Sequence, residues 1–390
     1  MTDDAQRSPQ TNQGISRRDF VRVSALAAGS MAFGVCREDP TAPPDPTAQV
    51  AAVRGDDLYG MAREALESIG GIENIVHEGE SVFIKPNMVT LPWASNNNTF
   101  TNGECTKPEI VIAVAEECLR AGASEVVVGD GSQMKTFDWS YATTLDGTTN
   151  LVAEVERLNN QYSGNVRVAC LEADSPAWDE VPSRGYLDTI AVSSLVARAD
   201  RVITIPVAKT HSWAQLTLAS KNFVGVTSMD RYAQWTGSYW DRGKGLDHST
   251  PRSIAAIYLD VVNGVKPDLA IVDFSIGIEG DGPGIGHGGR TVDMKDRLGS
   301  WLLLASTDIM AADATAARIM SHDVGSISQL QMGFDMGLGE IRENRIELLG
   351  ERLDDLQMEW DPAELKNRYS QSGHVCPMFA ARHRPHRHHV

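Results

Sequence analysis

The chain has 390 residues, 42% hydrophobic and 22% charged, which is ordinary for a globular protein with room for one or two domains. Its formal net charge of −17 argues against general nucleic-acid binding, which depends on a basic surface, but it leaves room for a local cationic pocket. The cysteines are scattered with no CxxC pair, so neither a zinc ribbon nor a four-cysteine cluster is encoded; they are Cys36, Cys105, Cys118, Cys170 and Cys376.

Residues 1–36 have the features of an export signal. The run Ser16–Arg22 matches the twin-arginine pattern S-R-R-x-F-[LV]-[KR], and the apolar stretch 23–35 that follows is shorter than a membrane-spanning helix. We therefore expect the twin-arginine export machinery as a partner, a periplasmic or cell-envelope location, and no spanning helix in the mature chain. Cys36 is a candidate lipid anchor, but Val35 fits poorly before such a cysteine, so cleavage without a lipid is favoured.

Three further segments follow the signal. Residues 37–55, rich in proline, are expected to form an extended tether, and residues 56–350 an α/β domain. Residues 351–390 form a C-terminal extension with a tail rich in histidine and arginine. Its histidines are metal-binding candidates, but a disordered basic tail is the favoured interpretation.

Helical and strand patterns alternate along the folded part. Helices are expected over 58–69, 106–122, 148–158, 252–263 and 308–320, and strands over 81–84, 125–128, 166–171, 202–207, 268–272 and 301–305. This alternation predicts an α/β fold with a mostly parallel, Rossmann-like sheet and helices on both faces. Two long loops are expected at the carboxyl edge of the strands: an aromatic one, 228–246, and a glycine-rich one, 277–290, either of which would serve as a lid.

Polar side chains follow four of the predicted strands. They are Lys85 with Asn87, Asp130, Lys209 with His211, and Asp273. Because parallel strands end at one edge of a sheet, these groups are expected to meet there, together with Lys221 and Asn222.

Such a cluster has a definite chemistry. Clustered lysines attract a carboxylate or phosphate and lower one another's pKa. We expect Lys85 and Lys209 to clamp the anion, Lys221 to act as an anchor or electrophile, and His211 to be the general acid or base.

The remaining candidates are less specific. Asp130 and Asp273 would orient these groups, bind a metal or neutralise the lysines, and the alternative for each is a turn or helix cap. Asn87 and Asn222 are expected to bind the substrate or cofactor. His248 and His287 are candidate metal ligands, and a metal or organometallic cofactor is compatible with the set.

These motifs resemble a family known as domain of unknown function 362. They are Lys85-Pro86-Asn87, Thr106–Glu109, Val128–Asp130, Lys209–His211, Lys221-Asn222 with Gly225, and Glu279–Gly284. Members are often exported by the twin-arginine route, and some carry a ferredoxin-like iron–sulfur module, whose cysteine pattern this chain lacks. The family has no established reaction.

A weaker likeness is to the cofactor-binding domain of nickel-pincer lactate racemase. There a strand is followed by a histidine and, ten residues on, by a lysine joined to the cofactor. The likeness implies that His211 moves a proton and that Lys221 anchors a cofactor. The glycines before that lysine are Ala219 and Ser220 here, and no nickel-ligand histidine matches, so a shared fold is expected rather than shared chemistry.

The leading hypothesis is an exported enzyme, either an oxidoreductase or an isomerase. It would have a cationic pocket for a small anionic substrate or cofactor and would transfer a proton or hydride on a hydroxy acid. The alternative is a non-catalytic protein that binds a metal or an anion in the cell envelope.

Overall fold

The computed structural model describes residues 46–95, 98–174, 177–183 and 187–365. These belong to one compact unit, Pro44–Val390. The expected export signal, the candidate lipid anchor Cys36 and the histidine-rich tail lie outside the described residues. Within them, none of the helices combines the length and the apolar character that a membrane crossing requires.

The regular elements alternate as the sequence predicts. The strands of the main sheet are β1 (Ala48–Gly55), β2 (Ser81–Pro86), β3 (Glu125–Asp130), β4 (Asn165–Cys170), β7 (Arg201–Ile205), β8 (Val207–His211), β9 (Gln215–Thr217), β12 (Leu269–Gly282), β13 (Arg290–Asp293), β14 (Trp301–Ser306) and β15 (Ile346–Leu349). The longer helices are α2 (Leu58–Ser68), α4 (Pro108–Arg120), α5 (Leu151–Gln161), α10 (Pro251–Val265), α12 (Ile309–Ile319) and α13 (Ser328–Asp335).

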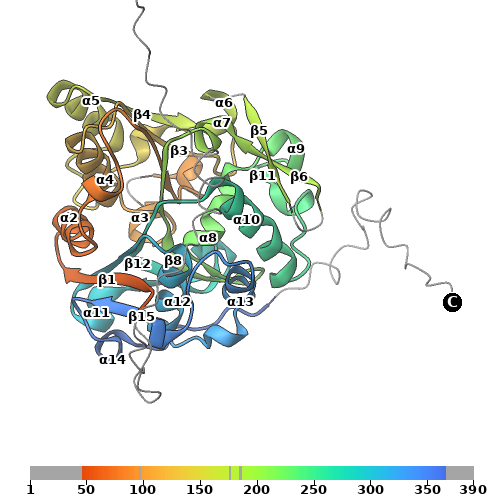
Figure 1. The fold of residues 1–390 in the computed structure, drawn as a ribbon. Helices are drawn as coiled ribbons and strands as arrows, with labels where there is room; N and C mark the ends of the chain where they lie inside the picture. Colours follow the sequence, from red (N-terminus) through yellow and green to blue (C-terminus); the bar gives the residue numbers. More distant parts are fainter. Residues whose placement is uncertain (1–45, 96–97, 175–176, 184–186, 366–390) are drawn as a thin grey trace, which may run out of the picture. The chain divides into compact units, whose positions relative to one another are not determined.

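The main sheet is mostly parallel, which confirms the predicted fold class. Its central path runs β15-β1-β14-β12-β7-β2-β3-β4, so β1 and β15, the first and last strands of the described residues, lie side by side (Figure 1). The strands β12, β7, β2, β3 and β4 run parallel to one another, whereas β14 is antiparallel to both β1 and β12. The carboxyl ends of β2, β3, β7 and β12 therefore share one edge of the sheet.

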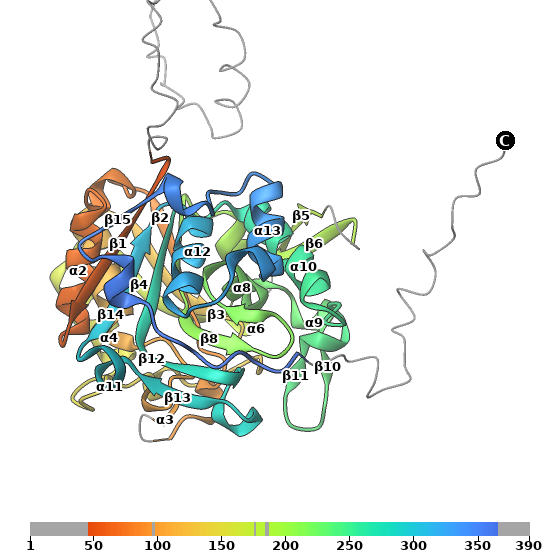
Figure 2. The same ribbon diagram turned by 90° about the horizontal axis from the view of Figure 1, so that it is seen from below.

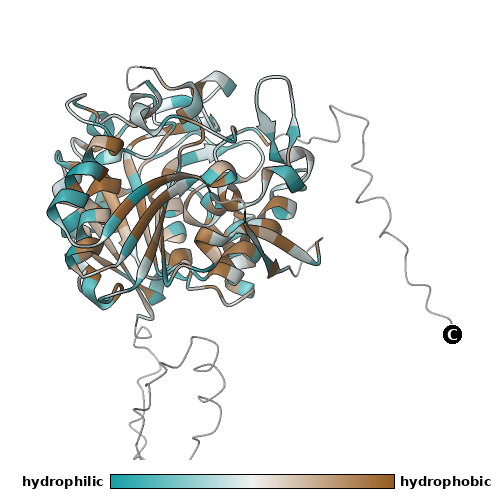
Figure 3. Cartoon of the chain, turned by 90° about the horizontal axis from the view of Figure 1, so that it is seen from above, coloured by the Kyte–Doolittle hydropathy of each residue, from teal (hydrophilic) through white to brown (hydrophobic). Residues whose placement is uncertain are grey.

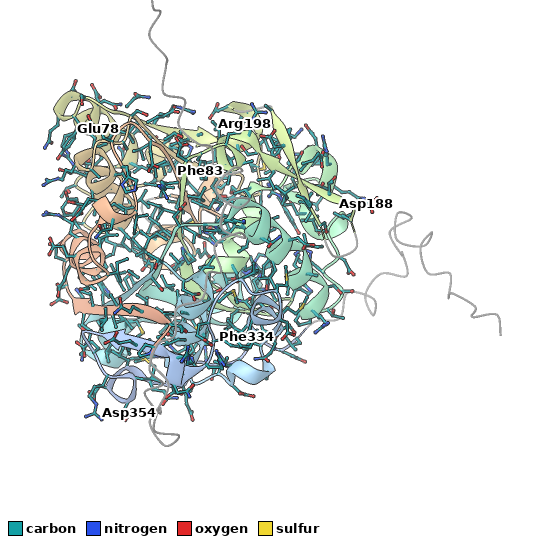
Figure 4. All side chains as sticks on the ribbon, in the orientation of Figure 1. Glu78, Phe83, Asp188, Arg198, Phe334 and Asp354 are labelled. Atoms are coloured by element: carbon teal, nitrogen blue, oxygen red, sulfur yellow. The ribbon has the colours of Figure 1, made fainter. Side chains whose placement is uncertain are left out.

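Two hydrophobic cores lie on opposite faces of this sheet. In β2, Val82 and Ile84 belong to the core under α2, α4 and α5, while Phe83 belongs to the core under α10, α12 and α13. Successive strand residues point to opposite faces, so a strand that is buried on both sides has an uninterrupted apolar sequence. Figure 3 shows the central strands in the hydrophobic colour, and Figure 4 labels Phe83 in the interior.

The predicted tether is wrong for its last eight residues. Residues 48–55 form β1, which pairs with both β14 and β15. Six of the eight residues in this strand are small or branched apolar or glycine residues, which fit between two helix-covered faces, so the folded part begins before Asp56.

Two expectations about loops are also wrong. Lys209 and His211 lie within β8 and not after a strand, and Gly277–Gly282 extend β12 and are not part of a flexible loop. The two strands pair, with Ile278 opposite Lys209. A Cβ atom at Gly277 would lie 2.3 Å from the carbonyl oxygen of Ala208, so this close approach requires glycine.

Candidate functional site

A cavity of about 200 Å³ lies at the carboxyl edge of the sheet. Its lining includes most of the predicted site residues, namely Lys85, Asn87, Asp130, His211, Lys221 and Asn222, and both candidate metal ligands, His248 and His287. Lys209 and Asp273 are not among the lining residues and are fully buried. The structure therefore brings together side chains from β2, β3, β8 and the loops that follow them.

Lys85 is held by the protein itself. Its Nζ atom lies 2.9 Å from Oδ1 of Asp130 and donates to the carbonyl of Pro86 (2.6 Å) and to Oδ1 of Asn222 (3.3 Å). An ammonium group has three hydrogens, so all of them have protein acceptors. Burial lowers the pKa of Lys85, and Asp130 opposes that shift. The charge of Lys85 is therefore neutralised by Asp130, and the expected role of anion clamp does not suit this lysine.

Lys209 lies behind the wall of the cavity. Its Nζ atom donates to the carbonyls of Glu104 (2.6 Å) and Pro283 (3.2 Å) and approaches Oδ1 of Asn87 at 3.5 Å. These contacts tie β8 to two loops. Lys209 thus joins loops and does not reach the cavity, contrary to the expected clamp. Burial lowers its pKa to about 8.

Asp273 is paired with a lysine that the sequence did not single out. Nζ of Lys107, at the start of α4, lies 3.3 Å from Oδ2 of Asp273, and both side chains are fully buried. The same carboxylate accepts the backbone N–H of Lys107 (3.1 Å) and the N–H and hydroxyl of Ser275. Asp273 therefore neutralises Lys107 away from the cavity. Lys107 belongs to the motif Thr106–Glu109, but a lysine before a helix-initiating proline is ordinarily solvated, so it was not predicted as a site residue.

Lys221 is the least constrained cation of the cavity. It lies on α8 (Ala219–Asn222), and its ammonium makes no hydrogen bond or ion pair with another described residue. Burial lowers the pKa of Lys221 to about 7, and the nearby charges of Lys209 and Lys85 add to this shift. At neutral pH a large fraction of this side chain is therefore a free amine.

His211 is fixed as one tautomer by the backbone. The N–H of Trp213 donates to Nδ1 of His211 at 3.1 Å. Burial, followed by the charges of Lys221 and His248, holds the pKa of His211 well below 6.5. In a neutral ring whose Nδ1 accepts, Nε2 carries the hydrogen. At pH 7 His211 is thus an uncharged hydrogen-bond donor.

Arg242 is a cavity residue that the sequence reasoning missed. Its Nε and Nη2 atoms donate to the carbonyl of Thr227 (3.1 and 3.0 Å), and Nη1 donates to that of Ser132 (2.6 Å). No described carboxylate lies within ion-pair distance of it. Burial lowers its pKa, but a guanidinium stays protonated and has five N–H hydrogens. Its position in the aromatic loop was the only sequence signal.

Arg242 directly follows an aromatic hairpin made of β10 (Gln234–Trp235) and β11 (Trp240–Asp241). Figure 2 shows this hairpin, and Arg242 lines the cavity. The rings of Trp235 and Trp240 lie 5.8 Å apart, and Nζ of Lys135 lies 4.7 Å from the ring centre of Trp240. Trp240 also lines the cavity, and its backbone N–H donates to the carbonyl of Gln133 at 2.9 Å. The hairpin is therefore attached to the loop after β3.

The described residues do not form a typical metal site. No group of three or more His, Cys, Asp or Glu side chains in this part of the chain is placed to hold a metal ion. Nδ1 of His248 lies 2.9 Å from the carbonyl oxygen of Leu246.

Comparisons with known proteins agree with the sequence motifs. The domain of unknown function 362 matches residues 82–318. The thylakoid-associated protein sll1697 of a Synechocystis strain is 28% identical over 288 residues, which are 72% of this chain and 75% of that protein.

Two solved structures are similar over part of the chain. The lactate racemase apoprotein of Thermoanaerobacterium thermosaccharolyticum is 10% identical with a TM-score of 0.38, over 71% of this chain and 57% of its own. A Thermotoga maritima protein is 12% identical with a TM-score of 0.35, over 58% of this chain and 53% of its own. The chain thus spans little more than half of either one. The match over 82–318 confirms the resemblance: the chain belongs to the family described as domain of unknown function 362.

Proposed function

We propose that the chain is an enzyme that binds a small anionic substrate in this cavity and transfers a proton next to the anionic group, as on a hydroxy acid. The observation that carries the proposal is a difference in pairing. Lys85 is neutralised by Asp130, whereas Lys221 and Arg242 line the same cavity without a described carboxylate partner. A buried cation without a counter-ion, as Arg242 is, favours an anionic ligand, and the half-buried Lys221 lies beside the same space.

Each of three side chains has a role that fits its surroundings. Arg242 uses its remaining N–H groups to bind a carboxylate or phosphate oxygen. His211 donates from Nε2 to the hydroxyl or carbonyl oxygen of the substrate, as a neutral imidazole can. Lys221 has a pKa of about 7, and its Nζ atom accepts the proton from the substrate carbon next to the anionic group. The same atom then returns the proton to that carbon, so the step needs no further reactant.

The location of the protein is part of the proposal. The twin-arginine pattern in residues 16–22 supports export to the periplasm or cell envelope. The thylakoid-associated relative is compatible with an envelope location.

Deuterium exchange tests the proton transfer itself, whatever product the full reaction forms. When the protein is incubated in heavy water with small 2-hydroxy acids, we expect mass spectrometry to show deuterium at the carbon next to the carboxylate. Lys221→Ala should slow this exchange by roughly 10²- to 10⁴-fold, the usual contribution of a general base. His211→Ala should slow exchange and weaken substrate binding by no more than about tenfold, the loss of one neutral hydrogen bond.

Lys295→Ala is the matched control, because this lysine pairs with Asp56 and stacks on Trp301, and it does not line the cavity. Exchange that persists at the wild-type rate in Lys221→Ala would contradict the proposal. Anion binding without exchange on any hydroxy acid would favour the alternative, a non-catalytic anion-binding protein.

A further inference from the structure

The helical turn that carries Lys221 is too short to be stable without contacts to other elements. The helix α8 is four residues long, and a single turn is unstable in isolation because its first N–H groups lack partners. The residue before it, Leu218, offers no side-chain cap. Something outside α8 must therefore fix the direction in which Lys221 leaves the backbone.

A buried carboxylate from a distant helix meets this need. Asp313 on α12 is fully buried, and its Oδ1 accepts the backbone N–H of Ala219 at 2.7 Å. Its Oδ2 accepts the backbone N–H of Ser220 at 3.0 Å and the hydroxyl of Ser220 at 2.6 Å. These two residues directly precede Lys221.

The carboxylate is itself held in place. The side-chain amide of Gln329 on α13 donates to Oδ2 of Asp313 at 3.3 Å, and the hydroxyl of Tyr258 on α10 donates to Gln329 at 2.8 Å. The chain of contacts links α8, α12, α13 and α10 within one core (Figure 1). Asp313 does not line the cavity, so a substrate would not touch it.

We infer that Asp313 is the positioning residue for Lys221: its hydrogen bonds to the backbone of Ala219 and Ser220 aim the amine into the cavity. The inference rests on the proposed function, in which Lys221 is the reactive amine. A positioning role also explains why Asp313 accepts hydrogen bonds from the backbone and does not pair with Lys221. A carboxylate paired with the ammonium would stabilise its charged form, whereas one that binds the preceding N–H groups leaves the amine unpaired.

The hydrogen-bond geometry suggests two informative variants. Asp313→Asn replaces one accepting oxygen with an NH₂ group, which opposes one of the two backbone N–H donors. Ser220→Ala removes the hydroxyl contact alone and serves as the milder variant if the first one does not fold.

Asp308→Asn is a matched control. Asp308 precedes the first turn of the same helix and accepts the backbone N–H groups of Met310, Ala311 and Glu340, each at 2.9 Å. It has no contact with α8 among these bonds. Its substitution should cost stability in a similar way, since it also opposes an NH₂ group to backbone donors.

The test is the pH profile of Lys221 labelling by an amine-reactive reagent, read by peptide mass spectrometry, alongside thermal unfolding. In Asp313→Asn we expect the midpoint to rise by about one pH unit or more from its wild-type value near 7, because the amine relaxes towards solvent. Ser220→Ala should move it in the same direction by less. Asp308→Asn should lower the melting temperature and leave the profile unchanged.

An Asp313→Asn protein that melts earlier but keeps the wild-type labelling profile would overturn the inference, because the role would then be structural only. The labelling readout does not depend on turnover. If the profile shifts but no hydroxy acid exchanges its proton, the positioning role of Asp313 stands and the proposed reaction falls.

Discussion

Lys85 and Lys221 line the same cavity, yet their surroundings give them different chemistry. Lys85 has three oxygen acceptors, one of them a carboxylate, and it therefore remains a bound cation. Lys221 has none among the described residues, and the neighbouring lysines add to the cost of its charge. The sequence placed both near the cavity, but it could not show which lysine the protein neutralises, because that depends on contacts across 45 to 137 positions of the chain.

Anion binding should therefore draw protons from solution. Free Lys221, with a pKa lowered to about 7, is mostly neutral at pH 8, and a bound anion favours its charged form. Calorimetry at pH 8 in buffers of different protonation enthalpy should show the uptake of a fraction of a proton per bound anion, so that part of the bound population keeps the free amine that the proposed proton transfer needs. At pH 6, where Lys221 is already charged, the uptake should disappear. The same uptake in Lys221→Met would assign the proton to another group.

At the scale of elements, the sequence predicted the strands and their parallel arrangement, but it did not predict which elements contact one another. The strands that contain Lys85, Asp130 and Asp273 are parallel as expected, and Lys85 and Asp130 meet at the cavity, whereas Asp273 lies within β12, which continues to Gly282. Hydrophobic periodicity does not predict the pairing of β8 with β12. That pairing depends on glycines of β12 whose missing side chains let the backbone of β8 approach closely. Arg242 was not predicted because its three hydrogen bonds go to backbone carbonyl oxygens of loops that are distant in sequence.

The turn η4 (Phe223–Val226) shows how tightly the elements fit. The carbonyl of Gly225 accepts the backbone N–H of Gly131 at 3.0 Å, and a Cβ atom at Gly225 would lie 2.6 Å from Oδ1 of Asp130. Gly225→Ala should therefore disturb the pair of Asp130 and Lys85 and destabilise the protein by about 1–3 kcal/mol in urea unfolding.

Gly286→Ala is the matched control, since a Cβ atom there meets nothing within 4 Å although the neighbouring His287 lines the cavity. Its unfolding free energy should stay within about 0.5 kcal/mol of the wild type. Equal stability of the two variants would mean that η4 tolerates movement away from the ion pair.

At the scale of the whole molecule, the positive charge of the cavity contrasts with the negative net charge of the chain. A net charge of −17 repels anions at long range, so an anion must be held by local contacts with buried groups. Burial of Arg242 supplies such contacts, because a charge-assisted bond is stronger where water is excluded. The proposed anion binding therefore depends on Arg242 more than on any property of the surface.

Calorimetric titration of lactate into the wild type and Arg242→Gln tests this dependence most directly. We predict that the wild type binds lactate and that Arg242→Gln weakens binding by roughly 30- to 150-fold, the equivalent of about 2–3 kcal/mol for a charge-assisted bond. Arg352→Gln, which changes an exposed arginine outside the cavity, should bind like the wild type. Lactate affinity that is unchanged in Arg242→Gln would contradict the anion site proposed here.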